Sequence, residues 1–252
     1  MNKILQIAGG VLAIASSFAW AQAEEPVAPE ASALADTSTP DHGEAPAKIQ
    51  SAISESIAPK YTLSDEETPL VHVYTPDEIN QWVERGNHIY VIKTLNQCQF
   101  ASDIEKRARK GMAAAYEFLY GEMLINGACF TRNIGNGIYY IQQAVDLGYP
   151  AAMRRLAFFY ETGRYVSQDV VKSESMMHEA AMIGFVPARI DWGGMLVRNL
   201  GSPRDYEEAY SWLHGIVPAT PAQSMRTREY MALLRERMPE NVVERALRHR
   251  FK

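Results

Sequence analysis

Residues 149–184 read YPAAMRRLAFFYETGRYVSQDVVKSESMMHEAAMIG, and residues 185–220 read FVPARIDWGGMLVRNLGSPRDYEEAYSWLHGIVPAT. Laid over each other, the two stretches bring Tyr149 onto Phe185 and Leu156 onto Trp192, at a step of 36 residues. A fixed period of this length is the sequence signature of stacked helical hairpins. Each hairpin buries its apolar face only against its neighbours. The pattern therefore predicts an all-α solenoid whose faces bind other proteins.

Three repeats are expected in the segment 112–219, over residues 112–148, 149–184 and 185–219. The leading helix of each repeat carries large or small apolar residues at four-residue spacing, which places them on one helix face. These columns are Ala115, Leu119 and Met123, then Ala152, Leu156 and Tyr160, then Ala188, Trp192 and Leu196. We interpret them as core. Gly127 and Gly163 are expected in the turns between helices, where glycine adopts a positive φ easily.

The chain before the repeats divides into three parts. Residues 1–23 predict a signal peptide, because Lys3 precedes an apolar run and the segment ends in Ala21-Gln22-Ala23. Residues 24–70 are acidic and rich in Ala, Pro, Ser and Thr, so we expect a disordered linker. Residues 71–111 should form a small N-terminal segment with helices.

Two capping-box patterns predict where helices begin in this N-terminal segment. Thr75-Pro76-Asp77-Glu78 combines a Thr cap, a Pro in the first turn and a Glu three residues after the cap, and Gly86 is placed to end that helix. Ser102-Asp103-Ile104-Glu105 repeats the pattern and predicts a helix reaching about Lys110. At the other end, residues 220–252 predict C-terminal helices that cap the solenoid.

Composition and charge exclude some functions. The chain has 252 residues, 47% of them hydrophobic, and a net charge of -5. This mild negative charge argues against nucleic acid as a partner. Beyond the signal peptide, no stretch is long and apolar enough to span a bilayer directly. We therefore expect an exported protein of the periplasm.

Two cysteines in an exported chain indicate one disulfide, between Cys98 and Cys129. Cys98 precedes the first repeat and Cys129 falls in the turn between the two helices of that repeat. The bond would hold the N-terminal segment against the open end of the solenoid. The alternative is two buried free thiols packed as small apolar groups.

The sequence shows no complete motif for catalysis, cofactor binding or metal binding. His178-Glu179 would begin a zinc-protease helix, but position 182 is Met182, so no metal site is predicted. No nucleophile elbow, phosphate loop or dinucleotide-binding turn is present, and we expect no cofactor, no small-molecule substrate and no enzymatic activity. Acid/base pairs are conceivable at Glu207-Glu208 and at Glu174 with Glu179, but their columns favour solvated helix faces.

Arginines and tyrosines are the candidates for protein binding. The leading helices carry Arg154, Arg155, Arg189 and Arg198. Leading helices usually line the concave surface of a helical solenoid, and arginine is favoured at recognition sites for its rigid fork of donors. We expect Tyr206 and Tyr210 to be exposed and to extend this surface.

The repeat columns resemble a known family. Leu156-Ala157-x-x-Tyr160-x-x-Gly163 and His178-Glu179-Ala180-Ala181-x-x-Gly184 are similar to the Sel1-like repeat, a helical hairpin related to the tetratricopeptide class. Four blocks outside the repeat pattern resemble the MotX family of sodium-type flagellar motor proteins. They are Val73-Tyr74-x-x-Asp77-Glu78, Cys98 with Asp103-Ile104-Glu105-x-Arg107-Ala108, Gly201-Ser202-Pro203-x-Asp205-Tyr206-Glu207-Glu208-Ala209-Tyr210-x-Trp212-Leu213, and Arg237-Met238-Pro239-Glu240-Asn241-Val242-Val243 with Arg245-Ala246.

This resemblance implies a place and partners. Proteins of the MotX family belong to the T ring of the polar flagellar basal body in the periplasm, where they join a MotY-like partner and help to hold a PomB-like stator subunit at the rotor. A general periplasmic Sel1-like adaptor is the alternative, and it shares every feature except the four blocks. A hydrolase built from such repeats would need a disulfide in each repeat, and the second and third repeats contain no cysteine.

Overall fold

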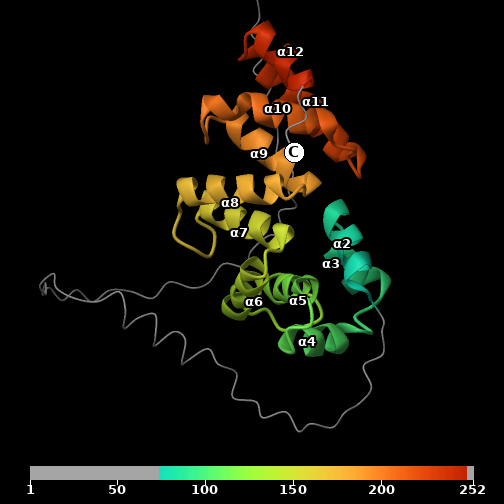
Figure 1. Ribbon diagram of the computed structural model, residues 1–252. Coiled ribbons are helices and arrows are strands. Elements are labelled where there is room, and N and C mark those ends of the chain that lie inside the picture. Colours follow the sequence, from blue (N-terminus) through green and yellow to red (C-terminus); the bar gives the residue numbers. More distant parts are fainter. Residues whose placement is uncertain (1–73, 249–252) are drawn as a thin grey trace, which may run out of the picture. The chain divides into compact units, whose positions relative to one another are not determined.

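A computed structural model describes residues 74–248, all of which lie in one compact unit of the chain (Figure 1). The predicted signal peptide and the whole acidic linker precede this range, so both predictions lie outside the described residues. Within residues 74–248 every regular element is helical. The predicted all-α class is confirmed.

The N-terminal segment contains α2 (Pro76–Arg85), α3 (His88–Tyr90), the π-helical turn η1 (Val91–Leu95) and α4 (Ala101–Arg109). Helix α2 begins as its sequence predicts. The Thr75 hydroxyl accepts a hydrogen bond from the Glu78 N–H, and the Glu78 carboxylate accepts one from the Thr75 N–H at 2.8 Å. Gly86 ends the helix with a φ of 73°.

Helix α4 begins two residues earlier than its predicted capping box requires. Its cap position is Phe100, without a side-chain cap, and Ser102 lies inside the helix. The Glu105 carboxylate, which would have reached back to the cap, instead accepts hydrogen bonds from Arg109 and from the Tyr120 hydroxyl at 2.8 and 2.9 Å. Contacts with α5 and within α4 therefore override the local signal.

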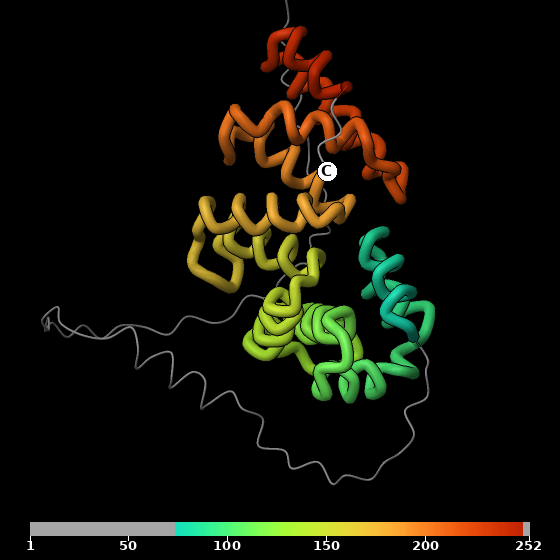
Figure 2. The backbone as a smooth tube through the Cα atoms, in the orientation of Figure 1, coloured from blue at the N-terminus to red at the C-terminus, as the bar shows by residue number. Residues whose placement is uncertain are grey.

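Three helical hairpins follow one another in chain order, as Figures 1 and 2 show. They are α5 (Ala114–Asn126) with α6 (Ile134–Asp146), α7 (Pro150–Thr162) with α8 (Val170–Met182), and α9 (Val186–Val197) with α10 (Tyr206–Gly215), the last preceded by the 3-10 turn η2 (Pro203–Asp205). Each hairpin packs on the next. Helix α11 (Pro221–Glu236) then packs on α9 and on α10, and α12 (Glu240–Arg248) packs on α10. We call α5, α7, α9 and α11 the leading helices.

The core follows the predicted columns. Leu119, Leu156 and Trp192, at the centre of the three leading helices, are at most 1% exposed. Tyr160 is the one member of the columns that stays half-buried. Gly127 and Gly163 end α5 and α7 with φ of 60° and 69°, as expected for turn glycines.

The first hairpin is closed by glycines. A Cβ placed on Gly121 of α5 would lie 2.8 Å from the backbone oxygen of Gly137 in α6, and one on Gly137 would lie 2.9 Å from the backbone oxygen of Gly121. Real side chains cannot tolerate such distances. The two backbones therefore approach as closely as they do because neither residue has a side chain.

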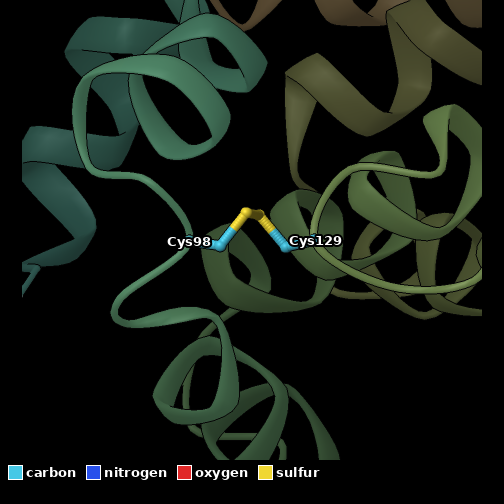
Figure 3. Close-up of a disulfide and its surroundings, with 2 residues drawn as sticks. All are labelled: Cys98 and Cys129. Atoms are coloured by element: carbon cyan, nitrogen blue, oxygen red, sulfur yellow. A yellow bond between two sulfur atoms is a disulfide. The ribbon is translucent and has the colours of Figure 1, made fainter.

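A disulfide joins Cys98 and Cys129, as predicted, with their Cα atoms 5.5 Å apart (Figure 3). Cys98 lies in the loop between η1 and α4, and Cys129 lies in the turn between α5 and α6. The bond therefore links the N-terminal segment to the first hairpin.

Candidate protein-binding surface on the leading helices

Helix α2 contacts the repeats far from its own position in the sequence. The Tyr149 hydroxyl, just before α7, donates a hydrogen bond to Asn80 Oδ1 at 2.7 Å. Gln223 in the first turn of α11 donates from Nε2 to the Glu84 carbonyl, also at 2.7 Å. Helices α2 and α3 also pack on α5. Part of the leading-helix surface is therefore in contact with the chain's own N-terminal segment.

A carboxylate of α5 links the first two hairpins. Glu122 is buried and accepts a hydrogen bond from Arg155 Nε of α7 at 2.6 Å, and His88 Nε2 lies 3.6 Å from it. Burial alone would raise the pKa of the Glu122 carboxyl, but the opposing effects of Arg155 and His88 hold that pKa below its ordinary value. Glu122 is therefore an anion held inside the structure by its cationic neighbour.

Asp191 of α9 is shared by two arginines from different helices. Its Oδ2 accepts a hydrogen bond from Arg154 Nε of α7 at 2.6 Å, and its Oδ1 accepts one from Arg226 Nη2 of α11. Burial would raise the pKa of the Asp191 carboxyl, but the two guanidinium groups lower it. We call these three residues the Asp191 cluster. It joins three leading helices.

The other two candidate arginines also contact neighbouring helices. Arg198, at the end of α9, pairs with Glu161 of α7 and donates to the Gly194 carbonyl at 3.1 Å. Arg189 donates to the Ala181 carbonyl of α8 at 2.9 Å, and its guanidinium lies 5.1 Å from the centre of the Trp212 ring. Burial lowers the pKa of Arg189. All four candidates thus hold helices together, and the structure uses much of their hydrogen-bonding capacity internally.

The two tyrosine candidates are not exposed as expected. Tyr206 and Tyr210 are only 7% and 5% exposed. The reason is that α10 packs between α9, α11 and α12, so its outer side is covered by the C-terminal helices. The Arg237 guanidinium lies 6.0 Å from the centre of the Tyr206 ring. Both residues therefore belong to the core of the last hairpin.

The carboxylates that could have formed acid/base pairs have other partners. Glu174 accepts a hydrogen bond from Trp192 Nε1 at 2.8 Å, and Glu207 pairs with Arg245 of α12. These two carboxylates are half-buried and paired, whereas Glu179 is exposed. In residues 74–248 no group of three or more His, Cys, Asp or Glu side chains gathers in a way that could hold a metal ion.

Sequence reasoning missed Glu122, Asp191 and Arg226. A signal was available, because Asp191 stands 37 residues after Arg154, which is close to one repeat period. Positions one period apart lie on neighbouring hairpins, so opposite charges at that spacing are able to pair.

Among the described residues, no helix combines the length and the apolar character that crossing a bilayer requires.

Comparison with known proteins identifies the hairpins. The Sel1 repeat family matches residues 114–149, 150–185 and 192–214, which fall on the three hairpins. A solved structure of a protective antigen from uropathogenic Escherichia coli, which displays an SLR fold, superposes with a TM-score of 0.51 at 20% identity, covering 70% of this chain and 40% of that one. At this identity the likeness concerns the fold alone. A Sel1 repeat protein from Oxalobacter formigenes gives a TM-score of 0.44 at 23% identity, over 51% of this chain and 97% of the other.

The family match over the three hairpins identifies the chain as a Sel1-repeat protein. A more specific match comes from the sodium-type polar flagellar protein MotX of Vibrio parahaemolyticus serotype O3:K6. It is 39% identical over 178 residues, which cover 71% of this chain and 84% of that protein. The chain belongs to the MotX family.

Proposed function

We propose that the protein is a non-enzymatic component of a polar flagellar motor and acts in the periplasm. The observation that carries this proposal is the 39% identity to a sodium-type polar flagellar protein over 84% of that protein's length. Such a span extends beyond the repeats themselves. A protein that shared only the repeats would match over a shorter part of the chain. The longer match favours a role in the flagellar motor over a role as a general adaptor.

Within the motor, the proposed role is to bind a MotY-like T-ring protein and a PomB-like stator subunit, so that stators assemble around the rotor. The stacked hairpins support this role because they offer long helix faces on a scaffold linked by inter-helix ion pairs. A rigid scaffold loses little conformational entropy when it binds.

Deletion of the gene, with complementation from a plasmid, tests the proposal. Swimming is measured in soft agar and filaments are counted by electron microscopy. Flagellated but non-swimming cells are the expected result, because a missing stator anchor stops rotation without stopping filament growth. Normal swimming would contradict the proposal and leave the general adaptor as the better description. Loss of filaments would assign the protein to basal-body construction and contradict the stator role.

A further inference from the structure

The Asp191 cluster carries one positive charge more than its carboxylate neutralises. Two guanidinium groups converge on the two oxygens of one aspartate. Their side chains are only 30% and 33% exposed, and that of Asp191 is 17% exposed. A surplus charge in a partly buried place is poorly solvated, and an anion that binds there recovers part of that cost. The neighbouring pair of Glu161 with Arg198, in contrast, has one charge of each sign.

Aromatic side chains lie one helical turn beyond the two arginines. Phe158 follows Arg154 by four residues in α7, and Tyr230 follows Arg226 by four in α11, so each pair shares a helix face. Phe158 is 40% exposed. Gly194 of α9 makes room for the Tyr230 ring, since a Cβ at Gly194 would lie 2.9 Å from it. The Tyr230 ring centre lies 5.6 Å from the Arg226 guanidinium. The Phe158 ring centre lies 6.0 Å from the guanidinium of Arg155, the residue after Arg154. Arginine and aromatic side chains are thus neighbours on both helices.

The Asp191 cluster also has an arginine nitrogen that is not used within the described fold. Arg154 uses Nε and Nη2 towards Asp191, and its Nη1 makes no hydrogen bond within residues 74–248. A guanidinium has five N–H donors in a planar fork, which suits a carboxylate. Arginine and aromatic side chains together are enriched where proteins bind each other. The chemistry that fits is an acidic residue beside an apolar or aromatic one.

We propose that Arg154, Arg226 and Phe158 form a binding site for an acidic segment of a partner protein. A carboxylate of the segment accepts hydrogen bonds from the two guanidinium groups, and a neighbouring apolar side chain covers Phe158. The site specifies the chemistry of the partner in the proposed function, and its biological role rests on that function. The existence of the site is independent of that function, because binding is measured on the purified protein without reference to motility.

The test uses a fluorescein-labelled peptide, Ser-Asp-Glu-Phe-Glu-Ser, and its amide counterpart, Ser-Asn-Gln-Phe-Gln-Ser. Fluorescence anisotropy measures their binding to the purified protein at low and at high salt. We expect the acidic peptide to bind and the amide peptide not to bind. Binding should weaken as salt rises, because exposed charges are screened over about 10 Å at 0.1 M ionic strength.

Variants locate the site. Arg154→Met leaves Asp191 paired with Arg226 and should weaken binding about tenfold, the loss expected for one charge-assisted hydrogen bond. Phe158→Ser should weaken it severalfold, and Arg154→Lys should retain part of the affinity. Arg228→Met is the matched control, since Arg228 is exposed and, two residues after Arg226, belongs to a different face of the same helix. It should change the Kd by less than about twofold.

Equal affinity of wild type and Arg154→Met, with unchanged melting temperatures, would overturn the proposal, and so would the absence of any binding by the wild type. Carbodiimide cross-linking of the Arg154→Lys variant distinguishes an added acidic peptide from an acidic segment of the same chain as the occupant of the site. Links from this lysine to the added peptide support the site. A link within one chain, from this lysine to an acidic residue of 24–70, would assign the site to the chain's own acidic segment and overturn the partner assignment.

Discussion

At the scale of single residues, the arginines of the leading helices contribute to stability before they contribute to binding. Arg154, Arg155 and Arg198 each pair with a carboxylate of another helix. Partly buried pairs of this kind are strongly coupled to the fold, because removing one partner leaves the other charge uncompensated. The effect of a substitution on binding must therefore be compared with its effect on the stability of the fold.

Asp191→Asn tests this coupling. The variant leaves Arg154 and Arg226 without their shared anion and should lower the free energy of unfolding by about 2 kcal/mol at pH 7. Because the folded-state pKa of Asp191 is depressed, its contribution is present above the unfolded-state pKa and is lost as pH falls through the folded-state pKa. Urea unfolding from pH 7 down to pH 3 should therefore show the two proteins converging. Glu229→Gln, on the exposed side of α11, is the control and should have little effect.

Glu117 should behave in the opposite way. It is 6% exposed, its Oε2 has no hydrogen-bond partner among the described residues, and burial followed by the charge of Asp146 raises its pKa. An acid with a raised folded-state pKa opposes folding once pH exceeds its unfolded-state pKa. Glu117→Gln should therefore raise the free energy of unfolding at pH 7 by about 1 kcal/mol, a gain that disappears near pH 4. A variant that is less stable at pH 7 would contradict this account, and Glu179→Gln, which is exposed, provides the baseline.

At the scale of secondary-structure elements, helix boundaries follow local signals wherever no tertiary contact competes for the same side chain. The Thr75 capping box starts α2 because Glu78 has no other partner among the described residues. The equivalent pattern at Ser102 fails because Glu105 binds Arg109 and Tyr120. The prediction was correct at Thr75 and wrong at Ser102, because only the fold shows which side chains are already engaged.

The crossing of α5 and α6 gives a prediction at this scale. In Gly137→Ala the added Cβ would meet the backbone oxygen of Gly121 at 2.9 Å, so the two helices have to separate. The free energy of unfolding should fall by about 2 kcal/mol or more, as in other overpacked cores. Thermal unfolding followed by circular dichroism measures it. Gly215→Ala is the matched control, because nothing lies within 4 Å of its Cβ, and it should be neutral or slightly stabilising.

At the scale of the whole molecule, the disulfide links the N-terminal segment to the first hairpin across a sequence separation of 31 residues. In the chain-entropy model, closing a loop of this length stabilises the fold by about 3 to 4 kcal/mol. A Cys98→Ser/Cys129→Ser double variant should therefore unfold at a clearly lower denaturant concentration and accumulate to lower levels in cells. Equal unfolding midpoints with and without reductant would contradict this expectation.

The candidate surface was only partly predictable from the sequence. The repeat period located the arginines on leading helices, but it could not show that Arg154 shares Asp191 with Arg226. Tyr206 and Tyr210 were expected to be exposed and to extend the arginine surface, but both are buried. Helix α12, which follows them by about thirty residues, covers their helix, α10, in the fold.

The sequence by itself determined the helical class, the repeat period, the turn glycines and the pairing of Cys98 with Cys129. The first three depend on backbone geometry and on a spacing that recurs every 36 residues, and the disulfide pairing follows because the chain has only two cysteines. Only the tertiary structure decided which charges meet, which tyrosines are buried and which helix closes the end. The physical reason is that ion pairing and burial depend on how neighbouring hairpins stack, and this brings together residues whose spacing carries no local signal.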